Sequence, residues 1–442
     1  MVITQSRLIC QAAFAATLLT APFQFFTVAI GDIYPSATLV LALMLILFYD
    51  ASKLVKTSIT TRTWAALVLV QVLSLLWAVD VRSGIRDIAY SFLFFFVFAA
   101  SMHESKRNPR LVIQLIVAYS ILTMIQSGLV IYFRLNPSVK IQYLQGHLAE
   151  IFTSPNTLID LFGSEQNNVL DPAKSGGFEI NANTGAAWIG MVGMVTIGLA
   201  IGLRRKLLFL VGLFHLTATF FSGSKAAAIL VCALLALMCI TVYVSEKLTP
   251  SRLAVLLLIF IFIAVAGSIL TTAGSSTDFG HASSDTFDVR KLIWAHAASE
   301  FLKNPILGQG FGGWSESFHA YAWQQGITDR YPPHDTLIQL WSQSGLLAAL
   351  LGAAFMAAFS AEVLTLVRSG SRTAAWIGAG ILCGFLFITM QGLGENWGLL
   401  GNLRMSPFLA VCLALSRVLS YYARLGARSP TLTRPMRPVE YE

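Results

Sequence analysis

Long apolar stretches recur along the whole chain, and they constrain its fold more than any motif does. Crossing about 30 Å of hydrocarbon takes roughly 20 helical residues, and about twelve stretches approach that length. They are residues 8–30, 34–49, 63–78, 87–102, 111–133, 183–203, 207–221, 224–244, 252–273, 336–366, 373–390 and 405–423. Several are short, notably 207–221, so the count is open by one. The chain is therefore expected to be an all-α polytopic membrane protein of about 12 transmembrane helices.

The basic residues indicate how these spans are oriented. If the N-terminus is inside, most of the 30 Lys and Arg residues fall in inner segments, as the positive-inside rule requires. The short outer loops carry only Arg82, Arg86, Lys225 and Arg404. Both termini are therefore predicted to be cytoplasmic. The net charge of +8 comes from clusters at span ends, which favour lipid headgroups over nucleic acid as the partner.

Polar residues are scarce within the spans. Only Lys225 and His215 are ionisable groups that could reach inside, while Glu362 is expected near an inner end. Ion-coupled transporters usually carry intramembrane acids that face a cavity. A polysaccharide or small-molecule permease is therefore a weaker alternative. The outer segments hold no Asp-x-Asp pair and no acid cluster, so neither a metal nor a cofactor is expected.

Two long outer loops, 134–182 and 274–335, interrupt the alternation of spans, and loops of this length are usually functional or disordered. The second begins with a Ser/Gly/Thr-rich stretch, 273–286, that is expected to be flexible. Residues 288–303 then predict an amphipathic helix, with Arg290 and Trp294 on one face. The glycine run after it lacks the strand and the Lys-Ser/Thr of a phosphate loop and predicts a tight turn.

The end of this loop predicts a defined helix start. Pro332, Pro333, His334 and Asp335 lead into the tenth span, and prolines followed by Asp or Thr are typical of helix N-termini. The positive end of the helix dipole favours a neutral His334 ring, the form that a general base needs. A histidine that only caps or packs the helix end remains the alternative.

Four short segments together resemble the O-antigen ligase and polymerase superfamily. They are Ser222-Gly223-Ser224-Lys225-Ala226-Ala227-Ala228; Arg290 followed by Trp294, Pro305, Gly308 and Gly310; His334-Asp335-Thr336-Leu337 followed by Gly345; and Gly177 to Asn183. Their order, their common sidedness and the topology of about twelve spans carry the resemblance. It covers roughly 176–350 by motif and the rest of the chain by hydropathy alone.

The resemblance implies glycan transfer from undecaprenyl diphosphate, without nucleotide sugars, at the periplasmic face of the bacterial inner membrane. It implies a helical bundle with a periplasmic helical subdomain before the tenth span. The acceptor is lipid A–core in ligases, another lipid-linked glycan in Wzy-type polymerases of O-antigen or exopolysaccharide, and a protein Ser or Thr in a third branch. The ligase reading is slightly preferred, and no nucleic acid is expected as a partner.

The resemblance also implies roles for individual residues. His334 would be the catalytic base and Arg290 would clamp the diphosphate, because displacement at an anomeric carbon needs both. Lys225 would be a second cation, although the family commonly has Arg there, which puts a bidentate role in doubt. Arg82 and Arg86 are lesser phosphate candidates.

Each of these assignments has a structural alternative. Lys225 could extend along the membrane surface to headgroups, and Arg290 could form a surface ion pair with Asp288 or Asp285. The candidate glycan contacts are Trp314, Tyr321, Trp323 and Asn183; for the aromatic residues an interfacial belt is the preferred alternative.

The expected domain organisation has three parts. Residues 1–175 hold the N-terminal transmembrane helices and the first long loop. Residues 176–424 form an O-antigen ligase-related region that includes the loop 274–335. Residues 425–442 predict a disordered cytoplasmic tail.

Overall fold

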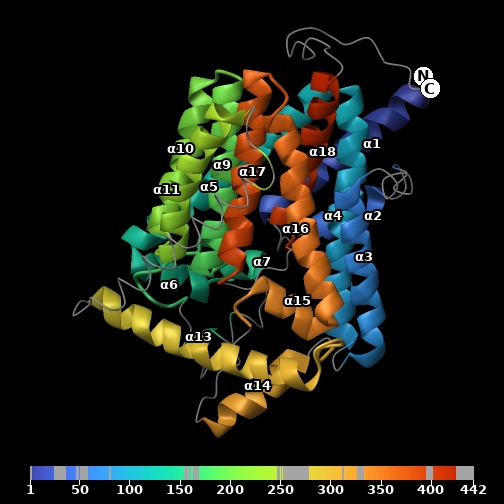
Figure 1. The fold of residues 1–442 in the computed structure, drawn as a ribbon. Helices are drawn as coiled ribbons and strands as arrows, with labels where there is room; N and C mark the ends of the chain where they lie inside the picture. The colour runs from blue at the N-terminus through green and yellow to red at the C-terminus, as the bar shows by residue number, and fades with distance from the viewer. Residues whose placement is uncertain are drawn as a thin grey trace.

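The computed structural model describes residues 2–23, 36–45, 49, 58–78, 81–153, 158, 161–162, 169–245, 249, 251, 278–310, 313–325, 333–394 and 402–424, with side chains except at 2–7, 82–83, 86–87, 278–289, 313 and 315–316. Within these ranges every regular element is a helix, which confirms the predicted all-α class (Figure 1).

The helices follow one another along the chain with short connections. Their bounds are α1 (Val2–Thr20), η1 (Ala21–Phe23), α2 (Ala37–Leu45), α3 (Ile59–Ser74), η2 (Leu75–Trp77), α4 (Val81–Arg107), α5 (Pro109–Leu135), α6 (Pro137–Gln145), α7 (His147–Phe152), η3 (Gly177–Glu179), α9 (Ala182–Gly202), α10 (Lys206–Phe221), α11 (Lys225–Tyr243), α13 (Asp278–Lys303), α14 (Gly313–Gln324), α15 (Thr336–Ser344), α16 (Leu346–Val367), α17 (Arg372–Gly392) and α18 (Met405–Arg424).

Eight helices among the described residues are long and apolar enough to cross a membrane. They are Ile59–Trp77, Ile88–Arg107, Pro109–Leu135, Ala182–Gly202, Lys225–Tyr243, Leu346–Val367, Arg372–Gly392 and Met405–Arg424, and the shorter helices Leu8–Phe23 and Lys206–Phe221 are apolar too. This composition is that of a multi-pass membrane protein. The predicted count of about twelve is not confirmed, because 252–273 lies outside the described residues and α2 spans only 9 residues.

The helix α9 lies at the centre of the bundle and packs along α17 and α10. A Cβ atom on Gly198 would come within 2.6 Å of the Gly380 Cα, so the α9 and α17 backbones touch at these two glycines. Small residues that allow such close approach are a common means of packing transmembrane helices. This contact fixes α17 beside α9 and so fixes the position of its C-terminal end.

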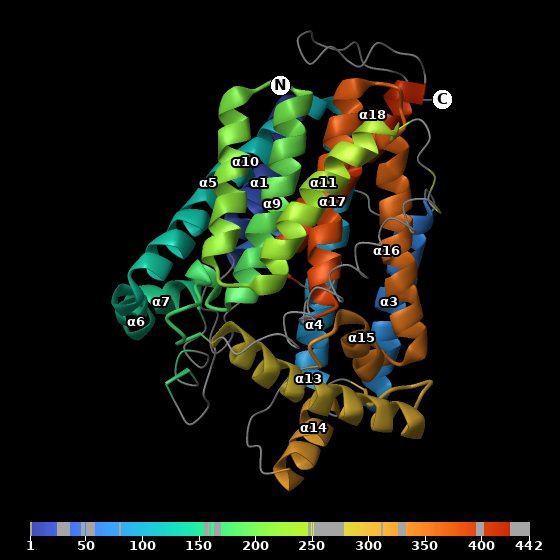
Figure 2. The same cartoon turned by 60° about the vertical axis from the view of Figure 1, so that its left-hand side comes forward.

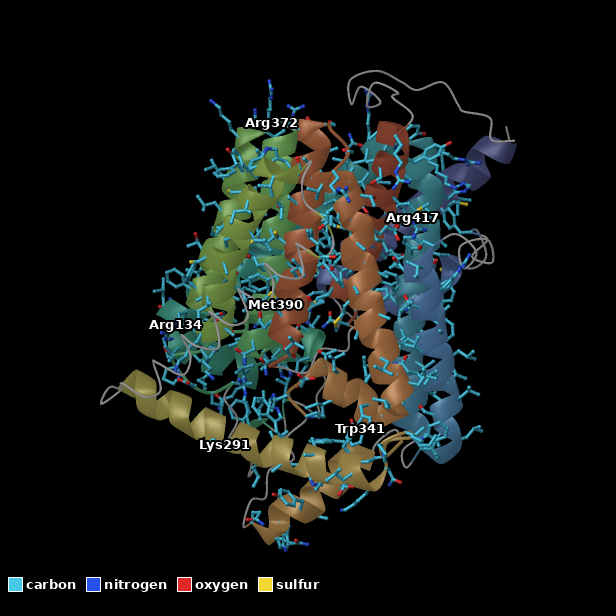
Figure 3. The ribbon with its side chains drawn as sticks, in the orientation of Figure 1. Arg134, Lys291, Trp341, Arg372, Met390 and Arg417 are labelled. Atoms are coloured by element: carbon cyan, nitrogen blue, oxygen red, sulfur yellow. The ribbon has the colours of Figure 1, made fainter. Side chains whose placement is uncertain are left out.

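One end of the bundle carries additional helices. In Figures 1 and 2, α13, α14 and α15 lie across the lower end of the spanning helices, which we call the α13 end. Figure 3 shows Arg372 and Arg417 toward the opposite end and Lys291 and Trp341 at the α13 end. The helical subdomain expected before the tenth span is thus formed by α13 and α14, and its side of the membrane stays a prediction.

The predicted long span 336–366 is wrong in one respect, because the helix breaks at Gly345. This residue has φ +84°, a left-handed conformation that α-helices do not contain, and it ends α15 and begins α16. The Leu346 N–H donates to the Ile306 carbonyl (2.9 Å) and the Gln309 N–H to the Ser342 carbonyl (3.0 Å). The turn after α13 therefore holds the break open, and α15 is a separate helix of 9 residues.

Two further loop predictions are wrong for a related reason, namely that the helices extend beyond the apolar stretches. Arg82 and Arg86 lie in the first turns of α4 and not in a loop, because α4 begins at Val81. The stretch 273–286 was expected to be flexible, but α13 already begins at Asp278. The predicted end of that helix at Lys303 is confirmed.

Candidate active site

The C-terminal end of α17 joins several predicted site segments through one side chain, Gln391. Its Nε2 donates to the carbonyl of Asn183 at the start of α9 (3.0 Å) and to the hydroxyl of Ser224 at the start of α11 (3.3 Å). Gln391 is 2% exposed, and its Oε1 accepts no hydrogen bond from the residues that the structure describes. The amide of Gln391 therefore holds Asn183 and Ser224 together, next to Lys225.

Arg290 reaches the same end of α17 from outside the bundle. Its Nη2 donates to the carbonyl of Gly394 at 3.0 Å, in a partly buried position. Gly394 follows Gln391 by three residues, so the two anchor points are about 5 Å apart along the chain. The alternative partners, Asp285 and Asp288, have side chains outside the described set.

Lys225 is the first residue of α11 and its side chain is exposed. The preceding turn, Ser222–Ser224, positions it: Ser222 Oγ accepts from the Ser224 N–H (3.1 Å), and the Ser222 carbonyl accepts from the Ser175 N–H (3.0 Å). This second bond brings the segment before η3 alongside α11. As a result the charge of Lys174 acts on Lys225, so the structure juxtaposes two cations.

His334 precedes the helix α15, and Asp335 is the residue that caps this helix. The Asp335 carboxylate accepts from the Leu337 and Ile338 N–H groups (2.8 and 2.9 Å), so the alternative in which His334 serves as the cap does not hold. The predicted helix start is thus confirmed. His334 itself is half-buried with φ +50°, a conformation uncommon for residues other than glycine that often marks functional sites.

The helices that carry His334 and Arg290 pack on one hydrophobic cluster. Ile338, four residues after His334, packs against the cluster that contains Ile293, three residues after Arg290. Each of the two candidate residues therefore lies about one helical turn from the same group of side chains. In Figures 1 and 2, α15 and α13 lie close beneath the lower end of α17.

The segment before α9 is held by polar contacts that the sequence analysis did not single out. Gln126 of α5 donates to the Gly176 carbonyl (2.6 Å) and accepts from the Phe178 N–H (2.8 Å). Glu179 forms an ion pair with Arg404, a side chain only 1% exposed that also lies over the Trp188 ring, 5.2 Å from its centroid. A buried ion pair is costly to break, so this segment has one position relative to α9.

The candidate glycan contacts differ strongly in exposure. Trp314 is buried between α13 and α14, and Tyr321 stacks on His296 with ring centroids 4.8 Å apart. Trp323 exposes 65% of its surface. Asn183 is half-buried, and its carbonyl is the acceptor for Gln391. Trp323 is therefore the aromatic residue of the three that has most surface available for a ligand.

The remaining candidates are Arg82 and Arg86 and the expected absence of a metal. The helix α4 carries both arginines in its first turns, and their side chains are outside the described set. Among the residues that are described, no group of three His, Cys, Asp or Glu side chains comes together. Metal independence remains a prediction.

Gln391, Lys174 and Arg404 contribute to this region, although sequence reasoning assigned none of them a role. Gln391 stands directly after the predicted span 373–390, and a lone amide at a span end is an ordinary interfacial residue. Lys174 lies in a long outer loop, where basic residues carry no topological information. The signal available for Arg404 was that it is one of few basic residues in the short outer loops.

Comparison with known proteins agrees with this placement of the residues. Residues 210–353 match the family model described as O-antigen ligase. The matched region runs from α10 to α16 and contains Lys225, Arg290 and His334, whereas Asn183 and Gln391 lie outside it. No curated protein matches the chain. The matched domain, with three candidate site residues in a multi-pass helical bundle, identifies the chain as a member of the O-antigen ligase and polymerase superfamily of membrane glycan transferases.

Proposed function

We propose that this protein is a glycosyltransferase of the ligase type in the bacterial inner membrane. It moves a glycan from undecaprenyl diphosphate to an acceptor hydroxyl of lipid A–core at the periplasmic face. In this proposal the α13 end is periplasmic and both termini are cytoplasmic. The clustering of Arg372, Arg417 and other basic residues at the opposite end supports that orientation (Figure 3).

The observation that carries the proposal is the convergence of cationic segments at the C-terminal end of α17. Arg290 is bonded to Gly394, and Lys225 follows Ser224, which is bonded to Gln391. A departing diphosphate needs positive charge, and a guanidinium beside an ammonium supplies it. Because α13 lies outside the spanning helices, a lipid-linked donor could enter this region from the membrane surface.

The transfer step in this proposal is a displacement at the anomeric carbon of the donor glycan. The acceptor oxygen forms a bond to this carbon while His334 takes the hydroxyl proton. The bond between the anomeric carbon and the diphosphate oxygen breaks, and its electron pair leaves with the diphosphate. Arg290 and Lys225 stabilise the negative charge that builds up on the leaving oxygens. Arg82 and Arg86 are proposed as further phosphate contacts, and Trp323, Trp314, Tyr321 and Asn183 as the candidate glycan contacts.

A Wzy-type polymerase is the second candidate, because the family match covers the superfamily and the acceptor distinguishes its branches. The test uses purified protein in detergent with an undecaprenyl-diphosphate glycan donor and EDTA. The acceptors are lipid A–core in one reaction and a second lipid-linked repeat unit in the other. A ligase labels lipid A–core and keeps its activity with EDTA. Chain extension of the lipid-linked unit would identify a polymerase, and a strict requirement for a divalent metal would contradict the metal-independent step.

A further inference from the structure

The segment 169–175 at the α13 end is held by cations that donate to its backbone. Lys140 of α6 is 4% exposed, and its Nζ donates to the carbonyls of Val169 (2.8 Å), Asp171 (2.7 Å) and Lys174 (3.0 Å). Arg134 at the end of α5 donates to the Pro172 carbonyl at 2.8 Å, and Figure 3 shows it at the edge of the bundle. These are hydrogen bonds to charged groups, so the segment has a fixed conformation.

This segment is also fixed against the turn that precedes Lys225. The Ser175 N–H donates to the Ser222 carbonyl at 3.0 Å. A Cβ atom on Gly223 would come within 2.2 Å of the Ala173 carbonyl oxygen and 3.4 Å of the Lys174 Cα. Two backbone segments that touch at Gly223 therefore bring Lys174 beside the start of α11. The juxtaposition of its charge with that of Lys225 follows from this contact.

The charges around this contact are strongly unbalanced. The ammonium groups of Lys140, Lys174 and Lys225 and the guanidinium of Arg134 are accompanied by one acid of the segment, Asp171, whose Oδ1 accepts from the Ala173 N–H (2.7 Å). Like charges placed together destabilise a fold unless an anion is bound between them. A diphosphate, which has two phosphate groups, matches a site with two adjacent ammonium groups better than a single phosphate does.

We propose that Lys174 is a second ammonium ligand of the donor diphosphate beside Lys225, and that Lys140 is the positioning residue that holds Lys174 there. The inference rests on the proposed function, since it names a further contact for the same donor. It assigns to the first long outer loop a role in donor binding, which the match at 210–353 does not include. Because Lys174 stands outside that region, the affinity it adds belongs to this chain's own loop.

The experiment measures binding of undecaprenyl diphosphate to the full chain in nanodiscs, with undecaprenyl monophosphate as the second probe. Lys174→Gln should weaken binding of the diphosphate lipid roughly tenfold, as loss of one hydrogen bond to a charged group predicts, and should reduce the preference for diphosphate over monophosphate. Lys174→Arg should restore most of the affinity. Lys206→Gln, at the opposite end of the bundle, is the matched control and should bind as the wild type does.

Lys140→Met separates positioning from direct contact. It should weaken binding like Lys174→Gln and also speed hydrogen exchange of the 169–175 amides, which Lys174→Gln should leave unchanged. Wild-type affinity for undecaprenyl diphosphate in Lys174→Gln would overturn the inference. If Lys174→Gln instead loses only phosphatidylglycerol in a competition assay, the lysine binds headgroups and the inference is equally overturned. A chain that binds the diphosphate through Lys174 but transfers no glycan would contradict the proposed function alone.

Discussion

Arg290 donates from Nη2 to the Gly394 carbonyl at 3.0 Å, and this bond ties the external helix α13 to the end of α17. A guanidinium has further N–H groups in the same plane, so one group can hold the helix while the others face a phosphate. The anchoring and the proposed phosphate contact therefore depend on the planar fork and not on charge alone.

Arg290→Lys should consequently be a poor enzyme although it keeps the charge. An ammonium cannot bond Gly394 and clamp two phosphate oxygens in the same geometry. We expect donor affinity and turnover each to fall roughly tenfold or more. The measurements are donor binding and transfer rate, with Lys303→Arg as control because Lys303 is exposed on the same helix and paired with Glu300. Equal affinity and turnover in Arg290→Lys and wild type would contradict the clamp.

Gln391 should act as a positioning residue for the starts of α9 and α11. Gln391→Met removes the bonds to Asn183 and Ser224 but keeps a side chain of similar size, so the fold should persist. Each lost bond is worth about 1 kcal/mol, and transfer should fall roughly tenfold with a smaller effect on the melting temperature. Gln325→Met, at an exposed position after α14, is the control. Unchanged transfer would mean that Gln391 only packs the helix end.

Lys225 should act through its charge. Lys225→Arg should keep substantial transfer activity, whereas Lys225→Ala should lose most of it. Removal of one charged partner from a partly desolvated site costs about 2–5 kcal/mol. The rates are compared at matched expression levels in membranes. Wild-type transfer by Lys225→Ala would favour the alternative in which this lysine only extends to lipid headgroups.

His296 should make the contact between α13 and α14 sensitive to acid. Burial lowers the pKa of His296 below its ordinary value of 6.5, with the charge of Glu300 opposing the shift. The folded state therefore binds its proton less readily than the unfolded state does, and stability rises with pH. This contribution is complete above about pH 6.5 and decreases as the pH falls below that value toward the lower pKa of the folded state.

The test for His296 is hydrogen exchange of the α13 and α14 amides between pH 7.5 and pH 5.5. Exchange corrected for its intrinsic pH dependence should increase at pH 5.5 in the wild type and change less in His296→Phe, which keeps the ring packing against Tyr321 and Trp314. An acid response that persists unchanged in His296→Phe would assign the effect to another group.

The sequence predicted most of the spanning helices because apolar length and charge placement are local properties. It also predicted the start of α15, since Pro333 and Asp335 act on the adjacent backbone. The break at Gly345 was missed because a glycine within an apolar stretch does not by itself end a helix. What ends it is the contact with Ile306, which lies far away in the sequence.

The candidate site was predicted only in part for the same physical reason. His334, Arg290 and Lys225 were named from short motifs, but the residue that gathers two of their segments, Gln391, belongs to another helix. Hydrogen bonds such as Gln391 to Asn183 join positions about 200 residues apart, and no local pattern encodes them. Lys174 was missed similarly, because only the backbone contact at Gly223 brings it to Lys225.

The most direct test of the account is transfer by His334→Ala together with its donor binding. A general base acts in the transition state, so its loss should lower the transfer rate about 10²- to 10⁴-fold. Affinity for undecaprenyl diphosphate should stay near the wild-type value, in contrast to Arg290→Lys. The assay uses purified protein, the undecaprenyl-diphosphate glycan and the acceptor that the wild type accepts. Full transfer activity in His334→Ala would contradict the proposed mechanism.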